Sequence, residues 1–328
     1  MFKIALIDSH LIKKGDFLEV KQLCEDAGGE FLLLECKTTD EVVAQAGDAD
    51  ALLVVYTSVD KSLLERLPKC KIAVRLGIGV DNYDLADFTA LGIIAANVPD
   101  YGVEEVAAHT MGMILAAERK IPYFEKKVRD GIWNDGEGYP MRRLSGRTIG
   151  FFGFGRIAQK LSQCCAPFNY NMIAFDPYLP DAVFEKFDVV KVTVEELFQQ
   201  VNTLALMAPL TEETKHILND DMLALAQDGM RVVNTARGEL IDTDALVRGL
   251  ESGKVAAAGL DVLDGEPLTD SAHPLLKFDS VFLTPHTAYQ TVESIAVLKR
   301  MAMETALDFI TGKPARNVVN PDVLTTLN

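Results

Sequence analysis

The sequence predicts an α/β protein with two domains, each built around a parallel sheet. Two observations support this. Short apolar or β-branched runs alternate with amphipathic segments along the chain, and a glycine-rich turn of the dinucleotide-binding type follows one of those runs. The 328 residues are enough for two ordinary domains, and 48% hydrophobic with 24% charged residues is a normal balance for a globular protein.

The predicted elements follow one another in a regular order. Strands are expected at 3–8, 31–35, 51–56, 72–76 and 93–96, with helices between them at 16–27, 60–67 and 84–90. A long helical pattern at 103–119 continues irregularly to residue 130. Later strands are expected at 147–152, 171–175, 203–207, 231–234, 256–260 and 281–284, before a final helix at 292–311 that Gly312 and Pro314 end.

This order predicts two Rossmann-like domains with a cleft between them. One domain would span residues 100–287. The other would be discontinuous, with residues 1–99 and 288–328, because we expect the final helix to pack back on the first domain.

Composition excludes several classes of function. The net charge of −16 argues against a nucleic-acid-binding surface. No uninterrupted apolar stretch is long enough to cross a membrane, and the first apolar run contains an aspartate, which favours a buried strand over a signal peptide. The five cysteines lack zinc-type spacing, so we expect no metal site, reduced thiols and a cytoplasmic location.

A glycine-rich turn at 153–158 predicts a dinucleotide site. Its sequence, Gly-Phe-Gly-Arg-Ile-Ala, fits the pattern G-x-G-x-x-G/A and lies between a predicted strand and a predicted helix. Gly153 permits the tight turn, Gly155 lets the backbone approach a pyrophosphate, and Ala158 is small enough for the helix to pack on the strand. The helix amides then bind the phosphates.

Asp176 indicates which dinucleotide is bound. It ends the strand at 171–175, roughly 20 residues after Gly153, where an acidic residue binds the ribose diol. A carboxylate there would repel a 2′-phosphate, and the next residues, 177–179, include no Arg or Lys to neutralise one. NAD is therefore favoured over NADP. The alternative is a glycine turn followed by a solvated aspartate.

Three polar side chains further along the chain suggest the chemistry. Arg237 follows a predicted strand, Glu266 lies in a loop before Pro267, and His286 follows Pro285 at another strand end. A guanidinium can bind a carboxylate or carbonyl, and a histidine can hold and release a proton near neutral pH. If Glu266 binds one ring nitrogen, it fixes the tautomer and favours the protonated ring, so the other nitrogen can donate to a ketone oxygen.

Each of these residues alone has a structural alternative. Arg237 could form a salt bridge, His286 could be a packed histidine, and Glu266 could be a solvated carboxylate. Their combination downstream of a dinucleotide turn favours hydride transfer to a 2-oxo acid instead.

These residues resemble the D-2-hydroxyacid dehydrogenases, the family that includes D-lactate, D-glycerate and phosphoglycerate dehydrogenases. The resemblance covers about residues 75–320 and rests on ordered motifs: Arg-Leu-Gly-Ile-Gly-Val-Asp-Asn at 75–82, Asn-Val-Pro at 97–99, Asn-Thr-Ala-Arg-Gly-Glu-Leu-Ile-Asp at 234–242, and the Glu266 and His286 segments. Residues 98–106 resemble the branch related to the C-terminal binding protein corepressors. The chain departs from many members in having Ala108 where they carry an acid before His109.

The resemblance implies further contacts, residue by residue. NAD would contact Arg156 and Ile157 along the pyrophosphate, Pro209 on the adenosine side, and Thr235, Ala236, Arg237, Asp261 and His286 around the nicotinamide and its ribose. Backbone amides at Ile78 and Gly79 would bind the substrate carboxylate. The substrate wall would include Tyr56, Thr57 and, near His286, Tyr289, for which ordinary packing is an equal alternative.

The expected function is therefore an NAD-dependent D-2-hydroxyacid dehydrogenase that converts a 2-oxo acid reversibly to a D-2-hydroxy acid. Arg237 would bind the substrate, His286 would be the acid/base, and Glu266 would tune it. Two alternatives stay open: an NAD(H)-sensing, corepressor-like binding protein, and a phosphite- or formate-type dehydrogenase of the same fold. The resemblance also implies a homodimer through an arm at 103–143. The sequence leaves the particular 2-hydroxy acid open.

Overall fold

The computed structural model describes residues 1–12, 17–133 and 140–325. The chain forms two compact units, Met1–Gly102 with Gln290–Asn328, and Val103–Tyr289. The first contains a five-stranded sheet and the second a seven-stranded sheet, and every pair of neighbouring strands is parallel. The predicted α/β class with two parallel sheets is confirmed.

The sheet of the first unit has the strand order β2-β1-β3-β4-β5. Its strands are β1 (Lys3–Leu6), β2 (Glu30–Leu33), β3 (Ala51–Val54), β4 (Ile72–Arg75) and β5 (Ile94–Ala96). This order reverses direction between β1 and β3, and in such sheets ligands bind at the carboxyl ends of the strands near the reversal.

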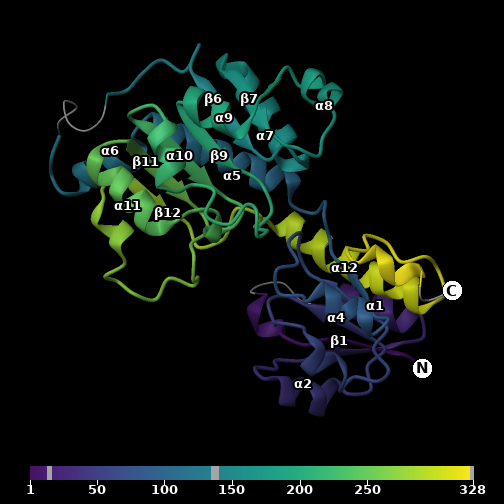
Figure 1. Cartoon of the computed structure of the whole chain (residues 1–328). Coiled ribbons are helices and arrows are strands. Elements are labelled where there is room, and N and C mark those ends of the chain that lie inside the picture. Colours follow the sequence, from purple (N-terminus) through teal and green to yellow (C-terminus); the bar gives the residue numbers. More distant parts are fainter. Residues whose placement is uncertain (13–16, 134–139, 326–328) are drawn as a thin grey trace. The chain divides into compact units, whose positions relative to one another are not determined.

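Helices cover both faces of this sheet. One face packs against the short helices α2 (Thr39–Ala46), α3 (Lys61–Leu64) and α4 (Leu85–Ala90), whose buried residues Val42, Leu63 and Phe88 share a core with Leu52 of β3. The helix α1 (Leu18–Asp26) contacts the final helix α12 (Val292–Ile310), which also packs against β3 and β4. Figure 1 shows α12 in yellow beside α1.

The C-terminal segment is fixed to the edge of the first sheet. Val318 pairs antiparallel with Ala96, the last residue of β5. Asn320 is 5% exposed, and its side chain accepts from the amide of Ala95 at 2.9 Å and donates to the carbonyl of Ile93 at 3.0 Å. Backbone groups of β5 that would otherwise lack partners at a sheet edge are therefore satisfied by a segment far away in the sequence.

The sheet of the second unit has the order β12-β11-β10-β9-β6-β7-β8. Its strands are β6 (Thr148–Phe152), β7 (Asn171–Phe175), β8 (Val190–Lys191), β9 (Thr203–Leu206), β10 (Met230–Asn234), β11 (Val255–Leu260) and β12 (Val281–Leu283). This is the doubly wound order of dinucleotide-binding domains with one strand added, and it reverses between β6 and β9.

Alternate residues of β6 point to the two cores of the second unit. Phe151 packs with helices α5 (Val103–Glu118) and α7 (Arg156–Cys165), whereas Phe152 packs in the core that contains residues of α9 (Val194–Gln200), α10 (Asp220–Leu225) and α11 (Thr243–Ser252). This is the period of two expected for a strand. Both faces of the sheet are covered, which explains the continuous apolar runs of its strands.

The long helical pattern after residue 103 is two helices, not one irregular helix. Lys120 has φ of 53°, a left-handed conformation that ends α5, and α6 begins directly afterwards as Ile121–Arg129. Beyond the expected elements, the structure adds α2, α8 (Asp181–Lys186), α9, α10, α11 and the short edge strand β8. Within the described ranges, no helix has the length and apolar character needed to span a membrane.

Candidate active site

The glycine-rich turn lies at the carboxyl end of β6, beside the reversal of the second sheet. Gly153 has φ of +88°, and a Cβ at this position would lie 2.8 Å from the backbone of Ala208. Any larger residue would be strained and would collide with the segment after β9. Gly153 therefore sets the turn, and the predicted contact Pro209 follows Ala208 directly.

Gly155 and α7 form a cradle that fits a pyrophosphate. Gly155 is the N-cap of α7 and has no side chain that could occupy the helix amides, and a Cβ there would meet no described atom within 4 Å. The N-terminus of a helix offers amide donors that the helix itself does not use, together with the positive end of the helix dipole. Arg156 and Ile157 open the helix, and Ala158 is buried against the sheet at 1% exposure.

Asp176 is held beside this turn. One carboxylate oxygen accepts from the amide of Phe154 at 2.9 Å, inside the glycine turn, and the other accepts from the amide of Tyr178 at 3.0 Å. The negative charge is therefore fixed next to the cradle, where it can accept from ribose hydroxyls and repel a 2′-phosphate.

Arg237 follows β10 in a loop that Asn234 organises. Asn234 is fully buried; its side chain accepts from the amide of Ala236 at 3.0 Å and donates to the carbonyl of Arg237 at 2.7 Å. Arg237 itself is half-buried and donates to the carbonyl of Ala236 at 2.6 Å. Thr235 bonds the hydroxyl of Thr110 on α5 at 2.8 Å, so both sides of the loop are fixed.

Asp261 fixes the segment that carries His286. Asp261 follows β11 and is 1% exposed. Its Oδ1 accepts from the hydroxyl of Thr284 at 2.5 Å and the amide of Thr287 at 2.9 Å, and its Oδ2 accepts from the amide of Ala288 at 2.9 Å. The carbonyl of Asp261 also accepts from the amide of His286 at 2.7 Å. These bonds hold His286 in a left-handed conformation, with φ of 50°.

His286 and Glu266 are in direct contact. Nδ1 of His286 lies 2.5 Å from Oε1 of Glu266, and the two side chains are 24% and 37% exposed. Burial alone would raise the pKa of Glu266, but the hydrogen bond and charge of His286 outweigh it and lower that pKa below its ordinary value. The charge of Arg237 acts in the same direction. Glu266 is therefore ionised near neutral pH, and it contacts Nδ1 of His286, not Nε2.

Gly238 explains why the Arg237 and Glu266 loops meet. A Cβ on Gly238 would lie 1.9 Å from the carbonyl carbon of Leu263 and 2.2 Å from the amide nitrogen of Asp264. Both are backbone atoms of the segment that leads to Glu266. Only glycine permits this close approach.

Two loops of the first unit also lie together, at the carboxyl ends of the adjacent strands β3 and β4. The fully buried Asp8 accepts from the amides of Val55, Tyr56 and Thr57 at 2.8 to 3.2 Å, which fixes the loop after β3. Asn82 donates to the carbonyl of Thr57 at 2.8 Å and so ties this loop to the one after β4.

The second of these loops contains Ile78 and Gly79. Asn97 donates to the carbonyl of Ile78 at 2.6 Å. Arg75, at the end of β4, is 7% exposed, its guanidinium lies 5.4 Å from the centre of the Tyr56 ring, and its Nε makes no hydrogen bond to any described residue. Gly77 provides the space, because a Cβ there would lie 1.2 Å from Nη1 of Arg75. A buried cation thus accompanies the predicted anion-binding loop.

The structure brings the predicted residues together in two groups. Arg237, Glu266, His286 and Asp261 share the second unit, and Tyr289 lies edge-on to His286, with ring centres 6.1 Å apart. Tyr56, Thr57, Ile78 and Gly79 share the first.

Sequence reasoning gave no role to four residues that shape these groups: Asp8, Arg75, His109 and Asn234. His109 bonds the hydroxyl of Thr284 at 3.0 Å and lies 3.7 Å from Asp261, so it supports the segment that carries His286. An aspartate or asparagine at the carboxyl end of an apolar run is the signal that could have identified Asp8 and Asn234.

Comparisons with known proteins identify relatives of the chain. Residues 111–288 match the family model of the D-isomer specific 2-hydroxyacid dehydrogenase NAD-binding domain. The chain is 38% identical to D-3-phosphoglycerate dehydrogenase of Methanocaldococcus jannaschii over an alignment of 294 residues. The alignment covers 89% of this chain and 56% of that protein. It therefore spans little more than half of that relative.

A relative of similar length is glyoxylate reductase of Aeropyrum pernix, 34% identical over 293 residues that cover 87% of both chains. Among solved structures, apo D-lactate dehydrogenase from Escherichia coli is 27% identical, with a TM-score of 0.81 over 97% of this chain and 100% of that one.

The close approach at Gly238 yields a prediction. Gly238→Ala should lower stability by about 1–3 kcal/mol, because backbone atoms at 263–264 must move. Gly112→Ala is the matched control: Gly112 lies in α5, and a methyl group added there would meet no described atom within 4 Å, so we expect a gain of about 0.5–1 kcal/mol. Denaturant unfolding followed by circular dichroism measures both. Equal changes in the two variants would contradict the prediction.

Proposed function

Because the chain belongs to the D-isomer-specific 2-hydroxyacid dehydrogenase family, whose NAD-binding domain its second unit contains, we propose that it reduces a 2-oxo acid to a D-2-hydroxy acid, reversibly and with NADH. The observation that carries the proposal is the 2.5 Å contact between His286 and Glu266. A carboxylate on one ring nitrogen leaves the other as a directed proton donor or acceptor.

Three residues of the second unit have separate roles in the proposed reaction. Glu266 stabilises the protonated ring of His286 and fixes its tautomer through Nδ1. His286 donates its Nε2 proton to the oxygen that becomes the hydroxyl, and takes it back in the reverse direction. Arg237 binds the substrate carboxylate and polarises the neighbouring carbonyl. When bound, the reduced dinucleotide supplies a hydride to C2 of the oxo acid.

We propose NAD as the preferred dinucleotide. Gly153, Gly155, Arg156 and Ile157 would hold the pyrophosphate, and the fixed charge of Asp176 would bind the ribose diol. Pro209 would contact the adenosine side. Thr235, Ala236 and Asp261 would contact the nicotinamide and its ribose. Oδ2 of Asp261 accepts one hydrogen bond from Ala288, so it keeps acceptor capacity for an amide donor.

In the first unit, we propose that the amides of Ile78 and Gly79 bind the substrate carboxylate and that Tyr56 and Thr57 contact the remainder of the substrate. We also propose a role for Arg75 in substrate binding, which the sequence did not suggest. Its buried guanidinium lies beside both loops, so it would supply positive charge for an anionic substrate. Tyr289, edge-on to His286, would limit the size of the substrate side chain.

The function is tested by oxidation of NADH against a panel of 2-oxo acids that includes glyoxylate, pyruvate, hydroxypyruvate and branched acids. We expect one class to react, NADPH to react more slowly, and His286→Ala to lower kcat by about 10²–10⁴-fold with NADH binding retained. Normal turnover in His286→Ala would rule out its role. Tight NADH binding with no turnover on any acid would favour an NAD-sensing binding protein or phosphite-type chemistry.

The Glu266 contact predicts a pH dependence. Because the folded pKa of Glu266 is lowered, its carboxylate is ionised at pH values above the ordinary carboxyl value of 4.5 and is protonated only as pH falls through the lower folded pKa. Glu266→Gln should reduce kcat by roughly 10–100-fold and remove any loss of activity at acidic pH that comes from protonation of Glu266, since the variant has no carboxylate to protonate. An unchanged profile in this variant would contradict the proposed role.

We also propose a homodimer through the 103–143 arm, of which residues 134–139 lie outside the described residues. Its support is a set of exposed apolar side chains after α5: Ile121, Val128, Ile132, Trp133 and Met141. Val128→Asp should increase the monomer fraction in light scattering, and Val292→Asp, an equal change at an exposed valine of the first unit, should not. A monomeric wild type would exclude the dimer.

A further inference from the structure

The first unit has a buried carboxylate at the reversal of its strand order. Asp8 follows β1 and is fully buried. The backbone groups that it binds follow β3, the strand on the other side of the reversal. Asp8 therefore joins the two strands near whose carboxyl ends a sheet of this order binds ligands.

The carboxylate of Asp8 accepts from three successive backbone amides. Oδ1 accepts from the amide of Val55 at 2.9 Å, and Oδ2 accepts from the amides of Tyr56 and Thr57, each at 2.8 Å. A buried charge is tolerated only where hydrogen bonds replace those it made with water, and such charge-assisted bonds are stronger than neutral ones. The same bonds satisfy three buried or partly buried amides beyond the end of β3. The carboxylate and the loop therefore stabilise each other.

The loop that Asp8 holds is connected to the second substrate loop. The guanidinium of Arg75 lies 5.4 Å from the centre of the Tyr56 ring. The carbonyl of Thr57 accepts from the side chain of Asn82 at 2.8 Å. A displacement of the loop after β3 would therefore be transmitted to the loop after β4.

A second aspartate joins β1 to β3 at the opposite end of the sheet. Asp50 precedes β3, and its Oδ2 accepts from the amide of Lys3, the first residue of β1, at 2.9 Å. If Asp8 served only to join these strands, the two aspartates would be equivalent. They differ in what they hold, because Asp50 binds an amide within a strand and Asp8 binds the loop with the proposed substrate contacts.

We propose that Asp8 is a positioning residue for the substrate, which acts through Tyr56 and Thr57 to hold both substrate loops in the arrangement that binds the 2-oxo acid. The inference rests on the proposed function. These loops would contact the acid equally before and during hydride transfer, so Asp8 acts on the affinity for the acid and not on the rate of the bound complex. The proposed proton-transfer residues His286 and Glu266 belong to the second unit.

The direction of the change in KM separates positioning from a simple effect of charge. Burial raises the pKa of the Tyr83 phenol, the charge of Arg75 lowers it, and the charge of Asp8 raises it, so both charges act on one group. Removal of the Asp8 charge alone would strengthen the attraction of an anionic acid and lower its KM. Loss of positioning raises KM instead.

The first test is steady-state reduction of the reacting 2-oxo acid by the full chain at saturating NADH. Asp8→Asn keeps the size of the side chain but replaces one carboxylate oxygen with an NH₂ group, which cannot accept from a backbone amide. We expect KM for the acid to rise by roughly 10–100-fold, kcat to change by less than about threefold, and the Kd of NADH to stay within about twofold.

A second variant keeps the proposal testable if Asp8→Asn folds poorly. Asn82→Ala removes the bond to the carbonyl of Thr57 at a half-buried position. It should raise KM in the same direction, with kcat and NADH binding retained. An unchanged KM in Asn82→Ala would show that the two loops are not held together for substrate binding.

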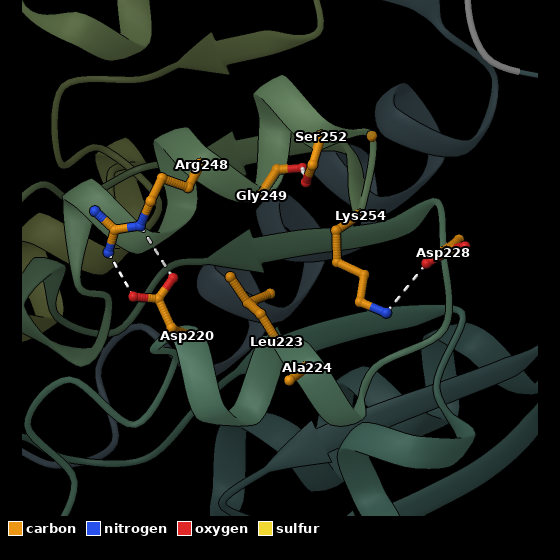
Figure 2. Close-up of a pocket in the computed structure, with 9 residues that line it drawn as sticks. Asp220, Leu223, Ala224, Asp228, Arg248, Gly249, Ser252 and Lys254 are labelled. Carbon is orange, nitrogen blue, oxygen red and sulfur yellow. Dashed lines mark hydrogen bonds and ion pairs between the residues drawn. The ribbon is translucent and has the colours of Figure 1, made fainter.

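Two matched controls carry the same Asp→Asn change elsewhere. Asp50→Asn makes it at the other end of the β1 and β3 pair. Asp220→Asn makes it in the second unit, where the carboxylate pairs with Arg248 at 3.1 and 2.6 Å across the groove between α10 and α11 (Figure 2). Both should leave KM within about twofold of the wild type, because neither change removes a bond to the 55–57 loop.

Amide hydrogen exchange tests the hold on the loop without turnover. Exchange at 55–57 should be faster in Asp8→Asn than in the wild type and unchanged in Asp50→Asn. With an active wild type, the proposal is overturned by unchanged exchange in Asp8→Asn, by an unchanged or lower KM in that variant, or by an equal rise of KM in Asp50→Asn. A wild type that reduces no 2-oxo acid contradicts the proposed function itself, and with it the substrate role of Asp8.

Discussion

A buried carboxylate holds the loop that carries the proposed acid/base. Asp261 accepts three hydrogen bonds from 284–288 through its side chain and one through its carbonyl, and these bonds keep His286 in a left-handed backbone conformation that few non-glycine residues adopt. The amide of Asp261 also donates to the carbonyl of Asn234, which organises the Arg237 loop. Asp261 thus links the ends of the adjacent strands β10 and β11. Gly238 lets the backbone of the segment that leads to Glu266 approach the Arg237 loop closely.

Parallel topology explains why residues so distant in sequence meet. The strands β10, β11 and β12 are neighbours, so the segments that follow them emerge at one edge, with Arg237, Asp261 and His286 in that order. The glycine turn after β6 emerges at the same edge, next to the reversal of strand order. In the first unit the loops after β3 and β4 meet by the same logic, with Asp8 and Asn82 as the polar links.

The sequence was sufficient for the fold class, and it also selected candidate site residues that sit in fixed motifs. Arg237, Glu266 and His286 could be selected because their neighbours are characteristic and because each follows a strand or lies in a loop. Arg75 begins the motif at 75–82, but its position against Tyr56 depends on packing that periodicity does not describe. The break at Lys120 was missed because lysine carries no signal for a left-handed residue. Two ion pairs of the buried Glu118 join α5 to arginines far away in the sequence and could not be inferred from local spacing.

The proposed chemistry is tested most directly by following deuterium from NADH labelled at C4 into the product of a reacting 2-oxo acid. If His286, supported by Glu266, is the proton donor, the wild type will yield a 2-hydroxy acid of D configuration with deuterium at C2, and His286→Ala will yield almost none at equal NADH occupancy. Deuterium that is never transferred to any 2-oxo acid, or transferred equally well by His286→Ala, would contradict the proposed mechanism.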